Sequence, residues 1–128
     1  FRWEEALIFE GDSEPFTMYS HARCCAILRR TDGEAGGGPP DELHATEEEL
    51  LRQLARWPST VTRAANERKM HLLPAFAHSL AAAFNGFYRD CMVIGAPEQE
   101  FRLGLVNGTR QVLADVLGML GVVAPEEM

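Results

Sequence analysis

The strongest constraint on the fold is an apolar pattern of helical period in the segment from residue 73 to residue 91. Apolar side chains recur there at spacings of three and four, which places them on one face of an α-helix. The positions on this face are Leu73, Phe76, Ala77, Leu80, Phe84, Phe87, Tyr88 and Cys91. A helix with so broad an apolar face is stable only when other elements cover it, so the pattern predicts a helical core built around this segment.

The segment from residue 13 to residue 45 predicts a helix followed by a loop. Ser13 is a favourable N-cap, and Glu14 and Pro15 are favoured in the first turn of the helix that would follow. The glycine and proline run at residues 36–40 cannot continue a helix or a strand, so residues 31–45 are expected to form a surface loop.

Two further regions read as helices. Thr46 and Glu49 have the spacing of a capping box and predict a helix that ends near Trp57, and a second helix is expected after Pro58. The last helix is expected from about residue 98 to Leu120, with Gly121 as its C-cap. The residues expected to face inward from it are Val106, Leu113, Val116, Leu117 and Leu120. With no strand of consequence, the prediction is an all-α bundle of about five helices with short connections.

Composition limits the function classes. The 128 residues argue for one domain, and 46% hydrophobic content is enough for one core. The net charge of −7 argues against a protein that coats nucleic acid without specificity. Residues 15–31 nevertheless carry +3 and residues 51–71 carry +4, so a local basic face is possible. The chain has no membrane-length apolar run and no signal peptide, and its start at Phe1 suggests a piece of a longer protein.

The sequence offers no metal site, disulfide framework or catalytic constellation. The cysteines are odd in number, two are adjacent, and no CxxC occurs, which is typical of a reducing compartment. His71 and His78 are seven residues apart, too far to ligate one ion unaided, and no HxxxH or ExxH occurs around any of the four histidines. No serine or cysteine stands in a nucleophile elbow, and the glycine run lacks the Lys-Ser or Lys-Thr of a phosphate loop. Composition and spacing alone therefore indicate a helical bundle without an active site.

Four stretches, in order along the chain, resemble one family. They are "MYSHARCCAILRR", "EEELLRQLARWPSTVTRAA", "FNGFYRDCMVIG" and "LGMLGVVAPEEM". The first is similar to the helix that opens the DALR-type anticodon-binding domain of arginyl-tRNA synthetases. It matches that helix at Tyr19, His21, Ala22, Arg23, Ile27, Leu28 and Arg29. The chain departs from the family pattern at Phe16, Met18 and Ser20, and Met18 puts a thioether where the family usually has a glutamine amide.

This resemblance implies an organisation and a function. Residues 1–12 would be the link from a catalytic domain, and residues 13–128 the anticodon-binding bundle of a class I synthetase. The domain would recognise the anticodon loop of arginine tRNA and position it for aminoacylation by the catalytic domain of the same chain. No cofactor is expected in this fragment, whereas the parent enzyme, an ATP-dependent arginine–tRNA ligase, would use ATP and Mg²⁺. The resemblance also implies a cytoplasmic protein with neither membrane nor DNA as partner.

The resemblance also singles out candidate RNA contacts: Tyr19, Arg23, Asn85, Tyr88, Arg89 and Met128. A tyrosine ring can stack on a base, and a guanidinium can bind a phosphate or a base edge. Alternatively, Tyr19 is half-buried and Arg23 pairs with an acid, while His21 is a packed polar residue. Two other functions also stay open: a non-catalytic DALR-type RNA-interaction module, and a protein-interaction module with a large exposed apolar patch. The RNA hypothesis instead predicts that Tyr19, Arg23, Tyr88 and Arg89 converge.

Overall fold

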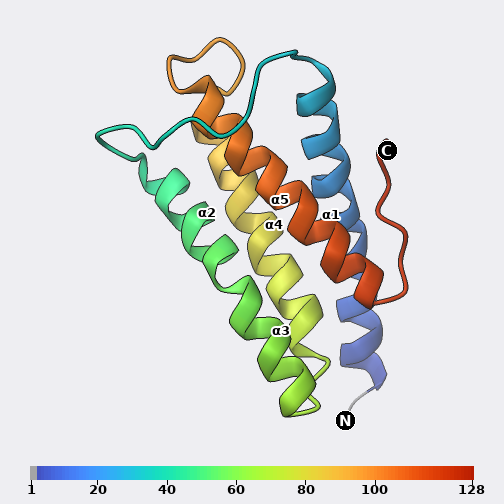
Figure 1. Cartoon of the computed structure of the whole chain (residues 1–128). Helices are drawn as coiled ribbons and strands as arrows, with labels where there is room; N and C mark the ends of the chain where they lie inside the picture. Colours follow the sequence, from blue (N-terminus) through green and yellow to red (C-terminus); the bar gives the residue numbers. More distant parts are fainter. Residues whose placement is uncertain (1–2) are drawn as a thin grey trace.

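The structure, a computed structural model, describes the backbone of residues 3–128 and the side chains from residue 15 onward. The described residues form helices and connecting segments, with no strand among them. The elements are α1 (Trp3–Arg29), α2 (Ala45–Ala55), α3 (Trp57–Asn66), α4 (Leu72–Asp90) and α5 (Gln99–Met119). Only Arg56, itself in a helical conformation, separates α2 from α3, so the two form almost one rod (Figure 1). The predicted all-α bundle is confirmed.

The centre of the bundle is α4, which packs against each of the other four helices. The predicted apolar face of this helix is confirmed, because Leu73, Phe76, Ala77, Leu80, Phe84, Phe87 and Cys91 are all buried. Tyr88, at the end of the face, is 39% exposed, so its ring emerges from the core at the surface. Helices α1 and α5 also pack against each other beside α4 (Figure 1).

The first helix begins earlier than the sequence suggests. It begins at Trp3 and continues through Pro15, so the predicted start after Ser13 is wrong. Proline removes one backbone hydrogen bond from a helix interior, and the packing of α1 against α4 and α5 outweighs that local loss. Residues 1 and 2 lie outside the described residues, and the assignment of residues 1–12 as a link between domains stays a prediction.

The start of α2 also differs from its prediction. The capping residue is His44 rather than Thr46: the Thr46 amide donates to His44 Nδ1 at 3.1 Å, and the His44 amide donates to Glu47 Oε1 at 2.9 Å. The Glu47 carboxylate is fixed from the other side by Arg102 of α5, whose Nε donates to Oε2 at 3.1 Å. Glu47, rather than Glu49, is the carboxylate that bonds back to the cap, because it is the third residue of a helix capped at His44.

The last helix ends in a turn that redirects the chain. Gly121 has φ +81°, its amide donates to the Gly118 carbonyl, and the Val122 amide donates to the Leu117 carbonyl at 2.9 Å. These two bonds are a Schellman motif, so Gly121 ends the helix as predicted. Leu120, expected to face inward, is 36% exposed because it already lies in this turn. Beyond it, the carboxyl-terminal segment, residues 122–128, runs back beside α1 (Figure 1).

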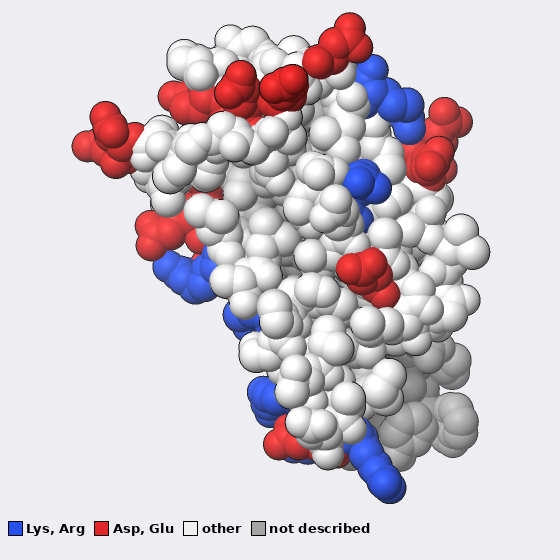
Figure 2. Space-filling model, viewed as in Figure 1, with Lys and Arg blue, Asp and Glu red and all other residues white. Residues whose placement is uncertain are grey.

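Charges are distributed unevenly over the surface. Acidic side chains gather at the end of the bundle where the glycine-rich loop crosses, whereas basic ones gather along α2 and α3 (Figure 2). The glycine-rich loop, residues 31–44, is fixed to α5 at one point, where the Gly36 amide donates to the Glu100 carbonyl at 3.0 Å. The side of α1 and the carboxyl-terminal segment carries side chains of both signs of charge (Figure 2).

Candidate functional site

An arginine lies between two tyrosines where α1 meets the end of α4. The Arg23 guanidinium carbon is 5.4 Å from the centroid of the Tyr19 ring and 4.7 Å from that of the Tyr88 ring. Tyr19 precedes Arg23 by one helical turn, and Tyr88 is brought to it by the packing of α4 on α1. Stacking on rings suits a planar guanidinium and leaves its edge free to donate hydrogen bonds.

Asn85 holds this arginine in place. Arg23 Nη1 donates to Asn85 Oδ1 at 2.7 Å. The amide nitrogen of Asn85 donates to Ser20 Oγ at 2.9 Å and to the Ala81 carbonyl at 2.8 Å, which fixes the orientation of the amide. Ser20, one of the departures from the family pattern, in turn donates to the Phe16 carbonyl at 3.0 Å. Asn85 therefore positions Arg23, and its direct contact with RNA stays a prediction.

A surface hollow of about 420 Å³ opens beside the arginine and the two tyrosines. One wall is α1, a second is Tyr88 at the end of α4, and the third is the end of the carboxyl-terminal segment. The residues that line the hollow are Tyr19, Ala22, Arg23, Ala26, Ile27, Arg29, Arg30, Tyr88, Glu126, Glu127 and Met128. Segments that are about a hundred residues apart in the sequence thus build one concave site.

The hollow presents both donors and acceptors. Arg23, Arg29 and Arg30 line it, together with Glu126 and Glu127. Arg29 Nη1 donates to the Glu126 carbonyl at 3.1 Å, whereas Arg30 has no acidic partner within ion-pair distance among the described residues. Within the same residues, Arg23 likewise has no carboxylate partner, so the alternative in which it pairs with an acid is not what the structure adopts. Such a site can bind a ligand that carries both acceptors and donors.

The hollow unites four of the six candidate residues, whereas Asn85 and Arg89 do not line it. Tyr19, Arg23, Tyr88 and Met128 line it. Arg89 does not: its side chain is 75% exposed, and its Nε donates to Asp90 Oδ1 at 3.0 Å. The expected convergence therefore involves three of its four members. That these side chains contact RNA stays a prediction for all of them, Arg89 included.

Sequence reasoning missed several residues of the hollow. Arg30, directly after the end of α1, could have been found, because it follows Arg23 by seven positions, a spacing that keeps helical side chains on one side. Glu126 and Glu127 had no such signal, since only the turn at Gly121 brings them back to α1. The partly buried pair of Glu47 and Arg102, 55 residues apart, was equally invisible in the sequence.

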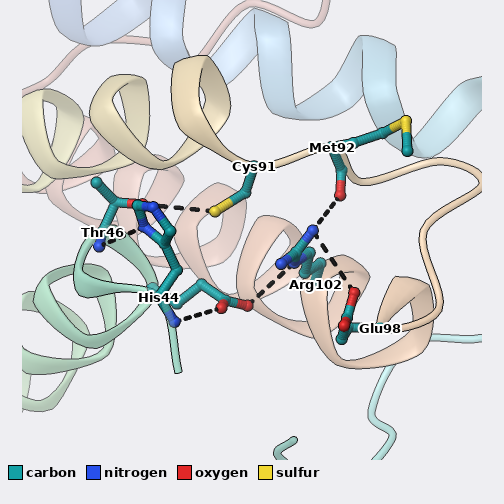
Figure 3. Close-up of polar contacts among 7 residues, drawn as sticks. His44, Thr46, Cys91, Met92, Glu98 and Arg102 are labelled. Atoms are coloured by element: carbon teal, nitrogen blue, oxygen red, sulfur yellow. Dashed lines mark hydrogen bonds and ion pairs between the residues drawn. The ribbon is translucent and has the colours of Figure 1, made fainter. Parts of the chain in front are cut away.

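A polar network fixes the segment that follows Tyr88. Arg102 Nη1 donates to the Met92 carbonyl at 2.6 Å, and Arg102 Nε donates to Glu47, which joins α5 to the ends of α4 and α2 (Figure 3). Burial disfavours the charged guanidinium, but the hydrogen bond and charge of Glu47 outweigh it, so the pKa of Arg102 lies above its ordinary value. The network holds the backbone that borders a second, smaller hollow of about 300 Å³, which also contains Arg30 and Tyr88.

Other kinds of site are not found in the part of the chain that the structure describes. No group of three or more histidine, cysteine, aspartate or glutamate side chains there could hold a metal ion. No helix in that part is both long and apolar enough to cross a membrane. The three cysteines are free and buried, and burial, followed by the neighbouring Cys25 thiol, raises the pKa of Cys24 above its ordinary value.

Comparison with known proteins identifies the family. Residues 17–128 match the DALR anticodon binding domain. The chain belongs to that family. It is 44% identical over 132 residues to the arginine–tRNA ligase of Haloarcula marismortui, and 44% identical over 139 residues to that of Thermococcus kodakarensis. All of this chain is covered in both comparisons, but only 23% and 22% of those two proteins.

A solved structure agrees with this result. The chain is similar to part of the Thermus thermophilus arginyl-tRNA synthetase, with a TM-score of 0.83 and 39% identity. The match covers all of this chain and 23% of that one. The DALR domain described here therefore spans less than a quarter of the length of the proteins it matches.

Proposed function

We propose that this DALR domain recognises the anticodon of arginine tRNA within a longer arginine–tRNA ligase. The observation that carries the proposal is the stacking of Arg23 between Tyr19 and Tyr88 at the rim of a concave site. Single-stranded bases are bound by such stacked aromatic and guanidinium groups, together with hydrogen bonds to their edges. Family membership and the coverage of arginine–tRNA ligases support the same assignment.

The chemistry of the hollow suits cytosine, the base that arginine anticodons share at their middle position. The Watson–Crick edge of cytosine carries an amino donor beside acceptor atoms. Guanidinium groups can donate to the acceptors, and the carboxylates of Glu126 and Glu127 can accept from the amino group. A patch of basic residues alone would be better suited to neutralise the phosphate backbone. The mixed charge of the hollow therefore favours hydrogen bonds to a base edge.

The domain has a positioning role in this proposal, and the reaction takes place elsewhere. The remaining part of the relatives, more than three quarters of their length, would contain the catalytic domain that uses ATP and Mg²⁺. The anticodon would be bound here while the acceptor end of the tRNA reaches that domain. The side chains that line the hollow bind and orient the RNA, and in this proposal none of them acts as an acid, a base or a nucleophile.

Binding of anticodon stem-loops tests the proposal. The fluorescence anisotropy of a labelled arginine stem-loop is measured in low salt, against a second stem-loop in which the middle cytosine is guanine. We expect the first to bind about five- to 150-fold more tightly, since one well-formed set of base contacts contributes about 1–3 kcal/mol. Equal affinity for the two stem-loops would refute base readout by this domain.

Three arginine variants locate the site. Arg23→Gln removes the stacked guanidinium and is expected to lose most of the discrimination between the two stem-loops. Arg63→Gln is the matched control, because Arg63 is an exposed arginine of α3, which contributes no residue to the hollow. Arg89→Gln tests a candidate outside the hollow, and its effect is expected to be small because its side chain is exposed and does not line the site. Loss of discrimination in Arg63→Gln would place the binding surface elsewhere.

A further inference from the structure

The recognition hypothesis gives no role to His21, a buried residue of α1. His21 is 3% exposed, and a buried imidazole is costly unless its nitrogens have hydrogen-bond partners. Its Nδ1 lies 2.6 Å from the carbonyl oxygen of Pro125, 104 residues along the chain. Because a carbonyl can only accept, Nδ1 must carry the proton of this bond. The contact therefore fixes the histidine tautomer and ties the first helix to the last residues.

The last residues of the carboxyl-terminal segment are held by few contacts. Val123 is 88% exposed and Met128 is 64% exposed, whereas Val122, Ala124 and Pro125 are partly buried. Among the described residues, the hydrogen bonds that reach it from α1 come from His21, to Pro125, and from Arg29, to the Glu126 carbonyl. The Arg29 bond is exposed to solvent, whereas the His21 ring is buried, so the His21 bond is the stronger restraint.

This restraint acts at the entrance of the segment into the hollow. Pro125 directly precedes Glu126, Glu127 and Met128, which form the third wall. His21 is only two residues from Arg23 on α1, so the same turn of helix supplies both the stacked arginine and the anchor of the wall opposite it. Freedom of the chain at Pro125 would therefore move the three residues that form this wall.

We infer that His21 is a positioning residue of the site: through Pro125 it holds Glu126–Met128 against α1, so that the hollow has its third wall before RNA binds. His21 itself does not touch the ligand. Restricting the wall in advance avoids the entropic cost of ordering it during association. The inference rests on the proposed function for the identity of the ligand, but the restraint can be measured without RNA.

The first experiment examines the restraint directly by NMR of the 128-residue chain. Histidine nitrogen spectra should show His21 as the Nδ1–H tautomer, and methyl spectra of labelled methionines should show Met128 with contacts to the tyrosines of the hollow. In His21→Ala the Met128 signal should become narrow and lose these contacts, while that of exposed Met70, outside the hollow, stays unchanged. His21→Asn, whose amide nitrogen can donate from nearly the same place, should restore most of the contacts.

Specific results would overturn the inference. A His21 ring in the Nε2–H tautomer would exclude the bond to Pro125, and this result needs no variant to fold. An unchanged Met128 signal in His21→Ala, with the helical circular dichroism of the parent chain, would show that something else holds the segment. If His21→Ala does not fold, the comparison of His21→Asn with His21→Gln replaces it, because the longer amide cannot donate from the Nδ1 position.

The second experiment uses stem-loop binding in a double-mutant cycle. His21→Ala should weaken binding about three- to tenfold, the loss expected for one net hydrogen bond. A chain that ends at Pro125 lacks the wall, and in that chain His21→Ala should have no further effect on binding. A merely structural histidine would weaken binding equally in both chains, which would refute the positioning role. If the unmodified chain binds neither stem-loop, the proposed function fails, whereas the NMR result still decides whether His21 restrains the segment.

Discussion

The partly buried pair of Glu47 and Arg102 allows a strong quantitative prediction about stability. Glu47 is 1% exposed and Arg102 is 14% exposed, so the carboxylate has almost no water to replace its partner. Arg102→Met leaves that carboxylate with only the His44 amide and also removes the bond to the Met92 carbonyl. Breaking a buried pair from one side costs about 3–5 kcal/mol, and the partial exposure of Arg102 points to about 3 kcal/mol.

Thermal and urea denaturation followed by circular dichroism measure this cost. For a chain of this length, about 3 kcal/mol corresponds to a fall in Tm of roughly 10 °C. The matched control is Arg52→Met, because Arg52 also makes two carboxylate contacts, to Glu48 at 3.1 Å and to Glu49 at 2.7 Å, but is 60% exposed. Exposed pairs contribute about 1 kcal/mol or less, so the control should lose little.

A double-mutant cycle separates the interaction energy of the ion pair from the cost of lost packing. Glu47→Gln combined with Arg102→Met should cost less than the two single changes together, by at least about 1 kcal/mol, because the double variant contains no unpaired buried charge. The reasoning is refuted if Arg102→Met costs no more than Arg52→Met. It is also refuted if the two changes at the buried pair are additive.

Three further predictions concern the turn, the core and the thiols. Gly121→Ala should lower the free energy of unfolding, measured by chemical denaturation, by roughly 1 kcal/mol because φ is +81° there. Gly118→Ala, at an exposed helical position with open space around it, should be neutral or stabilising. Equal effects of the two changes would contradict the argument. Phe84→Ala, at a fully buried position beside Tyr88, should cost about 3–5 kcal/mol, and a loss below 1 kcal/mol would show that the centre of the core lies elsewhere. Burial raises the pKa of Cys24, so its thiol stays protonated in the folded chain, whereas the thiol of the unfolded chain ionises above pH about 8.5. The free energy of unfolding should therefore fall from pH 8 to pH 10, and it should fall less in Cys24→Ala. An identical pH dependence of the two chains would contradict this reasoning.

The alternatives left open by the sequence can be weighed against particular contacts. Tyr19 is 51% exposed, so it is neither a core residue nor fully solvated, as a stacking platform requires. Arg23 stacks on two rings and bonds to an amide, where the sequence left a pairing with an acid equally open. His21 is indeed buried and polar, but its partner lies at the other end of the chain.

The sequence by itself determined the class of fold, the central helix and the family. The helical period at residues 73–91 specified the buried face of α4, because side-chain direction in a helix follows from spacing alone. Glycine at residue 121 specified the end of α5, because a left-handed φ strongly favours that residue. Four motifs in order along the chain, the first beginning at Met18, indicated the DALR family, which the comparison with known proteins confirms.

Only the tertiary structure decided which residues meet. Glu47, which completes the cap of α2 at His44, also accepts a hydrogen bond from Arg102, which is more than fifty residues away. The hollow needs the packing of α4 on α1 and the return of the carboxyl-terminal segment, and neither leaves a local trace in the sequence. Spacing reports on neighbours along one helix, whereas contacts between elements depend on the free energy of packing the whole chain. For that reason the candidate residues could be named from the sequence, but the site that unites them could not.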